Sequence, residues 1–338
     1  MVENSAYDVV IVTYNDAETL PACLAATRRM TPAPRQVIVV DNASHDASAE
    51  IALRHDCLVV PMQSNTGFAA GMNAGISRSA APWVLLLNPD CAPQPDFVQT
   101  LLGGVARHDR RQEIGSATGL LMRANGSGLA PSETVDAAGM TVNRSGRHFD
   151  RAAGDHISRA PQREGLVFGG TGAATLFSRR ALDDVAYADG AVFAPSFFCY
   201  REDAELAWRL QWRGWHCLYV PSARASHRRR FRPERGRRGH GTINRHSVKN
   251  RFLMRIHCAD LRWHLRCFPS WLIRDVLVVG ACLTIERASL PALRQVWSWR
   301  KDAWRRRRWV LSRSTVPSRR VAGWFRTRVE CVHGDSAG

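Results

Sequence analysis

Residues 7–44 have the sequence YDVVIVTYNDAETLPACLAATRRMTPAPRQVIVVDNAS, and this segment alone predicts the class of fold. Two short apolar runs, at residues 9–12 and 37–40, have the length and the β-branched composition of buried strands. Between them, residues 16–30 carry apolar side chains at helical spacing. A strand, a helix and a strand in this order indicate a parallel sheet, because parallel strands need a crossover connection. The segment therefore predicts an α/β fold.

The residues that follow extend the same pattern. A weaker strand is expected at residues 58–60 and a fourth strand at residues 83–87. Between these two strands, a glycine-bearing turn at residues 65–71 leads into a helix expected at residues 72–78. Three of the four strands end in polar residues able to hold a nucleotide. Open α/β sheets bind ligands at the carboxyl ends of their strands, so we expect a nucleotide site at this edge.

Two acidic clusters indicate the chemistry. The fourth strand stops at Asn88-Pro89-Asp90, which places a carboxylate at the carboxyl edge of the sheet, where a hard divalent cation could bind. The second cluster, Glu202-Asp203-Ala204-Glu205, directly follows the aromatic residues 197–200. It can supply a general base to the same site.

The chain contains five short motifs: VTYN at 12–15, VDNAS at 40–44, NTGF at 65–68 with Asn73, LNPD at 87–90 and EDAELAWR at 202–209. They occur in the order seen in family 2 glycosyltransferases of the GT-A fold, and over roughly residues 7–260 the chain resembles that family. Each motif alone is a weak signal, so their shared order and spacing carry the resemblance. Within the family, the chain looks most similar to the bacterial rhamnosyltransferase-like branch, which builds cell-wall and surface polysaccharides.

The resemblance implies a Rossmann-like, mostly parallel central sheet flanked by helices. It also implies a nucleotide-diphosphate sugar donor, with Thr13 and Asn15 at the pyrimidine base and Asp41 at the base or the ribose. A carboxylate is an acceptor suited to sugar hydroxyls. The full set that the resemblance assigns to nucleotide-sugar binding is Thr13, Asn15, Asp41, Asn42, Asn65, Gly67, Asn73, Asn88, Gly170 and Thr171.

The resemblance further implies a metal site and a catalytic base. Asp90 would hold Mg²⁺ or Mn²⁺ between the two phosphates of the donor, and His227 matches a histidine that completes the metal or diphosphate site in some relatives. Asn88 stands where the family usually has a first carboxylate. Asp203 is the predicted base, because inverting transfer needs a base beside the acceptor hydroxyl, opposite the leaving diphosphate. Glu202 is predicted to orient or bind the acceptor.

Simpler roles are open for several of these side chains. The helix dipole stabilises carboxylates in a first helical turn whatever their function, and Glu202, Asp203 and Glu205 would all lie in such a turn. Asn15 and Asp41 follow strands at positions where Asn and Asp are favoured as helix caps. We prefer the catalytic interpretation because distant motifs agree with it.

The length and composition set the outer limits. The chain has 338 residues, enough for one catalytic domain, which we expect at residues 1–260. Its nucleotide-sugar half would comprise about residues 1–110 and its acceptor half about residues 111–260. Residues 261–338 would form a basic, helical C-terminal extension. Nine cysteines without close pairs favour a reducing compartment, and the short polar start leaves no room for a signal peptide, so we expect a cytoplasmic enzyme.

The acceptor half has the least regular pattern. Residues 96–108 are expected to form a helix. Residues 115–154 are glycine-rich and polar with weak periodicity, which predicts mainly loops. A loop and a strand are expected over residues 166–177, similar to the segment that lies beside the sugar and the acceptor in relatives.

Charge is concentrated in the C-terminal part. The chain has a net charge of +17, yet residues 1–200 carry 16 Arg and Lys against 20 Asp and Glu, whereas residues 201–338 carry 31 against 10. Basic runs at 228–230, 237–238 and 305–308 alternate with tryptophans, a mixture typical of binding to an anionic membrane surface. The tryptophans are Trp263, Trp271, Trp297, Trp299, Trp304 and Trp309.

An apolar stretch precedes the longest basic run. Residues 268–285 are largely apolar, but Arg274 and Asp275 interrupt them, and the uncharged remainder is too short to span a bilayer. We expect this stretch to lie in the membrane interface or to pack as an amphipathic helix. Basic runs with aromatics also bind nucleic acid. No recognised nucleic-acid module accompanies them, so we expect no nucleic-acid partner.

The predicted function is inverting transfer of a sugar, L-rhamnose from its thymidine-diphosphate donor, to a hydroxyl of a polyprenyl-linked or cell-surface polysaccharide acceptor. The enzyme would lie on the inner face of the plasma membrane. Transfer of a hexose or galactofuranose from a uridine-diphosphate donor is an open alternative. A nucleotidyltransferase, which releases pyrophosphate, and a non-catalytic membrane or nucleic-acid adaptor are the alternatives from other classes. The sequence does not indicate an oligomeric state.

Overall fold

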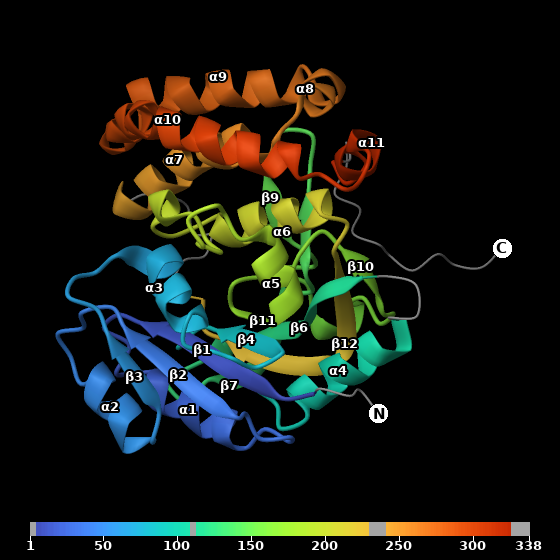
Figure 1. The fold of residues 1–338 in the computed structure, drawn as a ribbon. Helices are drawn as coiled ribbons and strands as arrows, with labels where there is room; N and C mark the ends of the chain where they lie inside the picture. Colours follow the sequence, from blue (N-terminus) through green and yellow to red (C-terminus); the bar gives the residue numbers. More distant parts are fainter. Residues whose placement is uncertain (1–4, 109–112, 230–240, 326–338) are drawn as a thin grey trace.

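The computed structural model describes residues 5–108, 113–229 and 241–325, so Arg230, Arg237 and Arg238 of the predicted basic runs lie outside the described residues. Its centre is a ten-stranded sheet in the order β10-β12-β6-β11-β4-β1-β2-β3, with β5 paired to β12 and β7 paired to β6 (Figure 1). Four neighbouring strands are mutually parallel, as the sequence predicts: β3 (Leu58–Pro61), β2 (Gln36–Asp41), β1 (Tyr7–Thr13) and β4 (Trp83–Leu87).

Both faces of β1 and β4 and of the second half of β2 are buried, which explains their continuous apolar runs. In β1, Val10 and Val12 point into one hydrophobic cluster, while Val9 and Ile11 point into the cluster on the opposite face. A strand that is covered on both sides needs apolar residues at every position instead of at alternate positions. The helices that cover it at this end are α1 (Leu20–Arg28), α2 (Ser48–Arg54) and α3 (Gly67–Ile76).

Two helix starts differ from the prediction. The helix expected from residue 16 begins at Leu20, because the Asp16 carboxylate accepts hydrogen bonds from Thr13 Oγ1 at 3.1 Å and Tyr14 N at 2.9 Å and closes a turn. The helix expected from residue 72 begins already at Gly67, whose φ of +82° allows the sharp entry that most residues cannot adopt.

The second half of the sheet continues beyond β4. The strand β11 (Ala174–Ser178) runs antiparallel to both of its neighbours, and β6 (Ile114–Asn125) and β12 (His216–His227) are again parallel to each other. The shorter strands are β5 (Cys91–Pro93), β7 (Ala130–Ala137) and β10 (Gly165–Val167), and β8 (Met140–Val142) and β9 (His148–Asp150) form a separate hairpin.

The prediction of mainly loops at residues 115–154 is wrong, because this stretch contains most of β6 and all of β7, β8 and β9. The strand β6 is buried on both faces over most of its length, so its side chains do not alternate in polarity. Its glycines are needed for close contacts and not for turns. A Cβ at Gly119 would lie 2.1 Å from the Ala223 carbonyl oxygen, and one at Gly115 would lie 2.9 Å from Ala181 and from Trp215.

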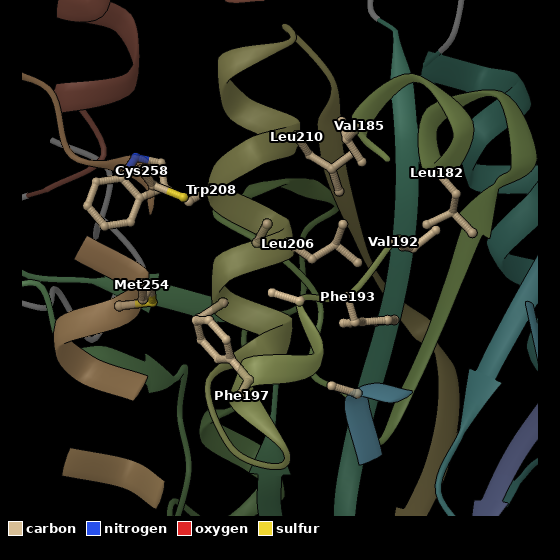
Figure 2. Packing of buried hydrophobic residues seen from close by; sticks show 14 of the residues in the cluster. Leu182, Val185, Val192, Phe193, Phe197, Leu206, Trp208, Leu210, Met254 and Cys258 are labelled. Atoms are coloured by element: carbon tan, nitrogen blue, oxygen red, sulfur yellow. The ribbon is translucent and has the colours of Figure 1, made fainter. Parts of the chain in front are cut away.

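Helices form the remaining layers. The expected helix at residues 96–108 is confirmed as α4 (Phe97–His108). On the opposite side of the sheet, α6 (Glu202–Trp212) lies between α5 (Arg179–Val185) and α7 (Gly241–Cys258). Figure 2 shows Leu206 and Leu210 of α6 facing Val185 and the segment with Phe193, while Met254 comes from the α7 side. Short 3₁₀ helices are η1 (Ile157–Arg159), η2 (Pro195–Phe197) and η4 (Arg287–Ser289).

The C-terminal extension is helical, as predicted. It contains α8 (Leu261–Cys267), α9 (Ser270–Leu283), α10 (Pro291–Ser312) and α11 (Ser318–Ala322), which stack over α6 and α7 on the side away from β1–β3 (Figure 1). Trp208 of α6, Trp263 of α8 and Phe325 belong to one hydrophobic cluster. The domain boundary at residue 260 stays a prediction.

Of the helices that the structure describes, none is by itself long and apolar enough to cross a membrane. The stretches Ser270–Leu283 and Arg287–Ser312 meet these criteria only when taken together, as a pair bent by 107°.

Candidate active site

The ends of β1 and β2 form one wall of the site. Thr13 and Asp41 are paired in the sheet, and the Asn42 amide donates to the Thr13 carbonyl at 2.9 Å. Asn15 has a φ of 56°; its amide donates to Ser44 Oγ at 3.1 Å and its side-chain oxygen accepts from His45 N at 2.8 Å. These bonds join the two loops that follow the strands. The structure therefore brings the residues predicted to bind the base and the ribose to a single edge.

Asn42 and Asn65 connect this wall to the start of α3. The side-chain nitrogen of Asn42, Nδ2, donates to Asn65 Oδ1 at 3.1 Å, and Asn42 Oδ1 accepts from Thr66 N at 2.9 Å. Asn65 Oδ1 also accepts from the Gly67 amide at 3.0 Å. A Cβ at Gly67 would lie 2.5 Å from the Phe198 carbonyl oxygen, so only glycine lets the aromatic segment approach α3 this closely.

Asn73 lies further along α3 and bonds to protein backbone. Its side-chain nitrogen donates to the Phe193 carbonyl at 2.8 Å, and its oxygen accepts from the Phe193 amide at 2.8 Å. In the structure, this residue ties α3 to the segment that leads into η2. Its predicted part in nucleotide-sugar binding stays a prediction.

Asp90 and His227 face each other at the other side of the edge. Asp90 Oδ1 lies 3.3 Å from His227 Nε2, and both residues are buried. The other ring nitrogen of His227, Nδ1, lies 2.7 Å from Asp136 Oδ2. Arg229 binds both oxygens of Asp136, at 3.0 and 3.1 Å, and pairs with Asp150 at 2.6 Å. The result is a continuous chain of alternating charges that begins at Asp90.

The charges in this chain shift the titration of its members. Burial alone lowers the pKa of His227, but the carboxylates of Asp90 and Asp136 outweigh it and raise the pKa to about 9. Burial alone raises the pKa of Asp136, yet its bonds to His227 and Arg229 prevail and lower that pKa to about 2. Asp136 therefore remains ionised at neutral pH and can hold the imidazole in one orientation.

Once His227 Nε2 gives up its proton, this nitrogen and the Asp90 carboxylate can act as two ligands of one divalent cation, whose binding would release that proton. Within the described part of the chain, no group of three or more His, Cys, Asp or Glu is arranged to hold a metal ion. The residues therefore fit a cation that receives its other ligands from a substrate and from water, as is usual for Mg²⁺ at diphosphates.

The loop before β11 connects the two acidic clusters. Asp203 Oδ2 accepts a hydrogen bond from the Gly172 amide at 3.1 Å, and the neighbouring Ala173 carbonyl accepts from the Asn88 amide at 2.9 Å. Asn88 lies two residues before Asp90 in the chain, so only one short loop separates Asp203 from the Asp90 motif. The two clusters, more than a hundred residues apart in sequence, lie at the same edge of the sheet.

Burial makes both carboxylates at the start of α6 weaker acids. It raises the pKa of Asp203, even though the Gly172 and Ala204 amides donate to this side chain. For Glu202, burial followed by the charge of Asp203 raises the pKa well above its ordinary value. The buried Oε2 atom of Glu202 has no hydrogen-bond partner among the described residues. A buried polar atom of this kind is suited to binding a ligand hydroxyl.

Gly170 and Thr171, the weaker sugar-binding candidates, lie beside Asp203 in the same loop. A Cβ at Gly170 would lie 2.3 Å from Thr175 Oγ1, so contact with the protein explains this glycine. Thr171 is buried, and its hydroxyl accepts from the Ala173 amide at 3.3 Å. In contrast, the atoms nearest to a Cβ at Gly172 would belong to Phe68 and Asp203, at 3.6 to 3.8 Å, an ordinary van der Waals distance.

Two elements of the site have no counterpart in the sequence motifs. Asp136 lies in the stretch predicted as loops, and α7 follows the last of the five motifs. The side chain of Asn250 on α7 donates to the carbonyls of Phe197, Cys199 and Tyr200 at 2.7 to 2.8 Å. Because carbonyl oxygens are the same in every residue, such partners leave no sequence signal.

Comparison with known proteins agrees with the motifs. Residues 8–186 match the family model described as Glycosyl transferase family 2. Over 306 residues, the chain is 28% identical to an N-acetylglucosaminyl-diphospho-decaprenol L-rhamnosyltransferase of Mycobacterium tuberculosis (strain ATCC 25618 / H37Rv), covering 82% of this chain and 94% of that protein. Over 219 residues, it is 25% identical to a poly-beta-1,6-N-acetyl-D-glucosamine synthase of Staphylococcus aureus (strain COL), covering 63% of this chain and 48% of that protein.

Solved structures share the fold at low sequence identity. GalNAc-T7, crystallised with UDP, GalNAc and Mn²⁺, has a TM-score of 0.60 at 14% identity, covering 89% of this chain and 57% of that chain. Residues 1–349 of S. aureus TarS in complex with UDP-GlcNAc have a TM-score of 0.54 at 12% identity, covering 91% of this chain and 90% of that chain. The likeness confirms the predicted GT-A arrangement of a mostly parallel sheet flanked by helices.

Proposed function

Because the chain belongs to glycosyltransferase family 2 and is a glycosyltransferase that uses a nucleotide-sugar donor, we propose that it transfers L-rhamnose from dTDP-rhamnose to a lipid-linked glycan with inversion. One observation carries this proposal: Asp203 and the Asp90 motif are joined by the single short loop 171–173 at the carboxyl edge of the sheet. The similarity over 306 residues to a rhamnosyltransferase whose name includes a diphospho-decaprenol supports this sugar and this type of acceptor.

The donor would bind along the wall formed by β1 and β2. In the proposal, Asp41 accepts hydrogen bonds from the ribose or the base, and Thr13 and Asn15 border the pyrimidine. The hydrogen bonds between the loops at Asn15 and Ser44 hold this wall in place before the donor arrives. Preorganised polar groups lose little conformational entropy on binding, which favours affinity.

At the opposite side, Asp90 Oδ1 and His227 Nε2 would hold Mg²⁺ or Mn²⁺. When bound, the cation supplies Lewis-acid stabilisation of the negative charge on the departing diphosphate. Asp136 holds the His227 ring from behind by accepting from Nδ1, so that Nε2 faces Asp90. Asn88 stands where the family usually has a first carboxylate ligand. Asp90 and His227 are therefore the two metal ligands that we propose from this chain.

Asp203 would act as the general base. It removes the proton of the acceptor hydroxyl while that oxygen bonds to the anomeric carbon, and the bond from this carbon to the diphosphate oxygen breaks on the opposite face. The products are the glycoside with inverted configuration and a nucleoside diphosphate. The raised pKa of Asp203 makes its carboxylate a stronger base than an exposed aspartate. Glu202 would bind or orient the acceptor hydroxyls.

We further propose that the enzyme works as a peripheral protein on the cytoplasmic face of the plasma membrane. The excess of basic residues in 201–338, 31 against 10 acidic ones, supports attraction to anionic lipids. A polyprenyl-linked acceptor is confined to the bilayer, so the active site must reach its surface.

Product analysis tests the function. The purified protein is incubated with dTDP-rhamnose or with UDP-sugars, Mn²⁺ or Mg²⁺, and a polyprenyl-diphosphate glycan, and the released nucleotide is identified. Acceptor-dependent release of dTDP, reduced about 100-fold or more in Asp203→Asn and unchanged in Asp183→Asn, is expected. Asp183 is a matched control, since it is an exposed carboxylate on another helix. Activity with UDP-sugars alone would overturn the proposed donor, and release of pyrophosphate would overturn the proposed reaction class. Full activity of Asp203→Asn would show that Asp203 is not the base.

A further inference from the structure

The outer surface of α8 and α9 is apolar. We define the α8–α9 apolar face by six exposed side chains: Leu261, Leu265, Phe268, Ile273, Val276 and Leu277. Each of these residues has an exposed fraction between 56% and 72%, which is unusual for so many large apolar residues on two neighbouring helices. In Figure 1, α8 and α9 form the outermost layer of the molecule, on the side away from β1–β3.

The acidic residue of α9, Asp275, is directed toward the protein. Asp275 accepts from Arg251 Nε at 3.1 Å and also pairs with Arg255, and both arginines belong to α7. Only 13% of the Asp275 side chain is exposed, compared with an exposed fraction of 63% for the adjacent Val276. A surface helix normally directs its charges to water and its apolar stripe inward. In α9 this order is reversed, so its outer face is suited to an apolar environment.

Exposed arginines accompany this face along the chain. Arg262 and Arg266 alternate with Leu261 and Leu265 along α8, and Arg287 follows α9; all three arginines are exposed. Residues 261–325 contain 14 Arg and Lys against three Asp and Glu. An apolar face accompanied by arginines complements lipid headgroups that carry negative charge above apolar chains.

We propose that the α8–α9 apolar face inserts into the interface of an anionic lipid bilayer, with α9 lying in the membrane plane. The 14 residues of α9 give it a length of about 21 Å, which suits a helix lying flat at the headgroup boundary. The inference deepens the proposed function and rests on its lipid-linked acceptor for its purpose, although insertion itself requires neither donor nor acceptor.

A second copy of the chain fits this face less well than a bilayer. In a two-fold symmetric dimer, the same patch would meet itself, and the arginines of one copy would lie close to those of the other. Like charges brought together at an interface are unfavourable. Anionic headgroups instead neutralise the arginines while the acyl chains receive the apolar side chains.

The inserted layer is connected to the active site through α7. On α7, Arg251 and Arg255 bind Asp275 of α9, and the residue directly before Arg251, Asn250, holds the loop that leads into Asp203. A glycan attached to a lipid would enter the active site from the bilayer. The loop that positions Asp203 is held by α7, and α7 is bound to the membrane-inserted helix α9. The proposal explains why the catalytic loop is fastened to the extension.

Vesicle flotation tests the proposal with the full-length protein. Vesicles of phosphatidylcholine with phosphatidylglycerol are compared with vesicles of phosphatidylcholine alone, for the wild type and for Ile273→Glu and Val276→Glu. The control is Leu53→Glu on α2, where the same chemical change falls on an apolar residue with an exposed fraction of 61%. We expect binding to the anionic vesicles to fall about tenfold or more in the two α9 variants and to stay unchanged in the control.

A salt titration separates insertion from electrostatic attraction alone. At about 1 M salt the Debye length is only about 3 Å, so attraction through the basic residues is largely screened. Vesicle binding by the wild type that persists at high salt, and is lost there in Ile273→Glu, supports insertion. Complete release of the wild type by salt, equal binding by the α9 variants, or a wild-type dimer that Ile273→Glu converts to a monomer would each overturn the proposal.

Activity measurements keep this proposal apart from the proposed function. With a short-chain acceptor dissolved in detergent, Ile273→Glu should release nucleoside diphosphate as fast as the wild type, and it should lose activity only with the acceptor in vesicles. If neither the wild type nor any variant transfers sugar, the proposed function is wrong, but the vesicle-binding measurements still test membrane insertion. If transfer occurs but Ile273→Glu equals the wild type in vesicles, insertion has no role in the reaction.

Discussion

At the scale of single residues, the segment before the base has an unusual backbone. Phe198, Tyr200 and Arg201 have φ values of 65°, 70° and 72°, a region that residues other than glycine rarely occupy. Each such residue costs of the order of 1–3 kcal/mol, so other contacts must hold the segment. Asn250 provides one of them through its three hydrogen bonds, and Lys249 Nζ donates to the Phe197 carbonyl at 3.4 Å.

Removing the Asn250 side chain should therefore misplace Asp203. We expect Asn250→Ala to lower kcat about 10- to 100-fold with a smaller change in KM, since small displacements of a base are costly. Steady-state kinetics and a melting curve check this. Asn143→Ala is the control, because Asn143 also holds a turn, with its oxygen accepting from Ser145 N at 3.1 Å. An unchanged kcat in a folded Asn250→Ala protein would contradict the positioning role.

Asp136 acts on the proposed metal site through His227. If it orients the ring, Asp136→Asn should weaken the apparent affinity for Mn²⁺ about 10-fold or more, measured as the metal concentration that restores half of the activity after chelation. Asp150→Asn is the matched control, since Asp150 binds the same Arg229, whereas the ion pairs of His227 among the described residues are with Asp90 and Asp136. Equal metal dependence in both variants would argue against the orienting role.

At the scale of elements, α6 carries a buried ion pair behind the catalytic turn. Arg209 Nε lies 3.0 Å from both oxygens of Glu205, as their helical spacing predicts, and both side chains are almost fully buried. Burial by itself raises the pKa of Glu205, but the charge of Arg209 and the bond to His257 outweigh it and lower the pKa to about 2, from an ordinary value of 4.5.

This shift predicts how stability depends on pH. A carboxyl with a lowered pKa in the folded state stabilises the protein above its unfolded pKa, and the contribution is lost as the pH falls from about 4.5 to about 2. Glu205→Gln should lose about 3 kcal/mol of unfolding free energy at pH 7, and the difference from the wild type should narrow over this interval. Urea unfolding at several pH values measures it. Glu50→Gln, in an exposed pair with Arg54, should change stability little.

At the scale of the whole molecule, the extension and the catalytic part share a hydrophobic cluster. The rings of Trp208 and Trp263 lie 5.6 Å apart, and Phe325 is 4.5 Å from Trp208. The extension is thus not uniformly a surface for lipids: Trp263 is buried, and Arg306 of α10 is buried and pairs with Asp189 at 2.7 Å. Membrane contact would fall to the outer residues alone.

Truncating a buried tryptophan should show this difference. We expect Trp263→Ala to destabilise the whole protein by about 3–5 kcal/mol, because it leaves a cavity against Trp208. Trp297→Ala, at a side chain with an exposed fraction of 68%, should change the melting temperature little. A single cooperative transition that shifts in Trp263→Ala would mean that the extension and the catalytic part unfold together. Two separate transitions would instead favour the predicted boundary at residue 260.

Local pattern was sufficient for much of the fold. The buried strands at β1, β2 and β4, and the placing of Asp41 and Asp90 at their ends, follow from short runs of neighbouring residues. The strand β6 was not predicted because it is buried on both faces and contains glycines that allow close contacts. Its sequence therefore lacks the alternation of polar and apolar residues that indicates a strand. The start of α3 was misplaced because Gly67 enters the helix with a positive φ.

The sequence by itself determined the class of fold, the order of the motifs and the chemical groups available at the edge of the sheet, because these depend on spacing within single elements. Only the tertiary structure decided which groups meet: Asp136 with His227, 91 residues apart, Asn250 with the loop before Asp203, and Asp275 turned inward to α7. The physical reason is that helical and strand periodicity show which face of an element is apolar, whereas the partner of each face is selected by contacts between distant parts of the chain.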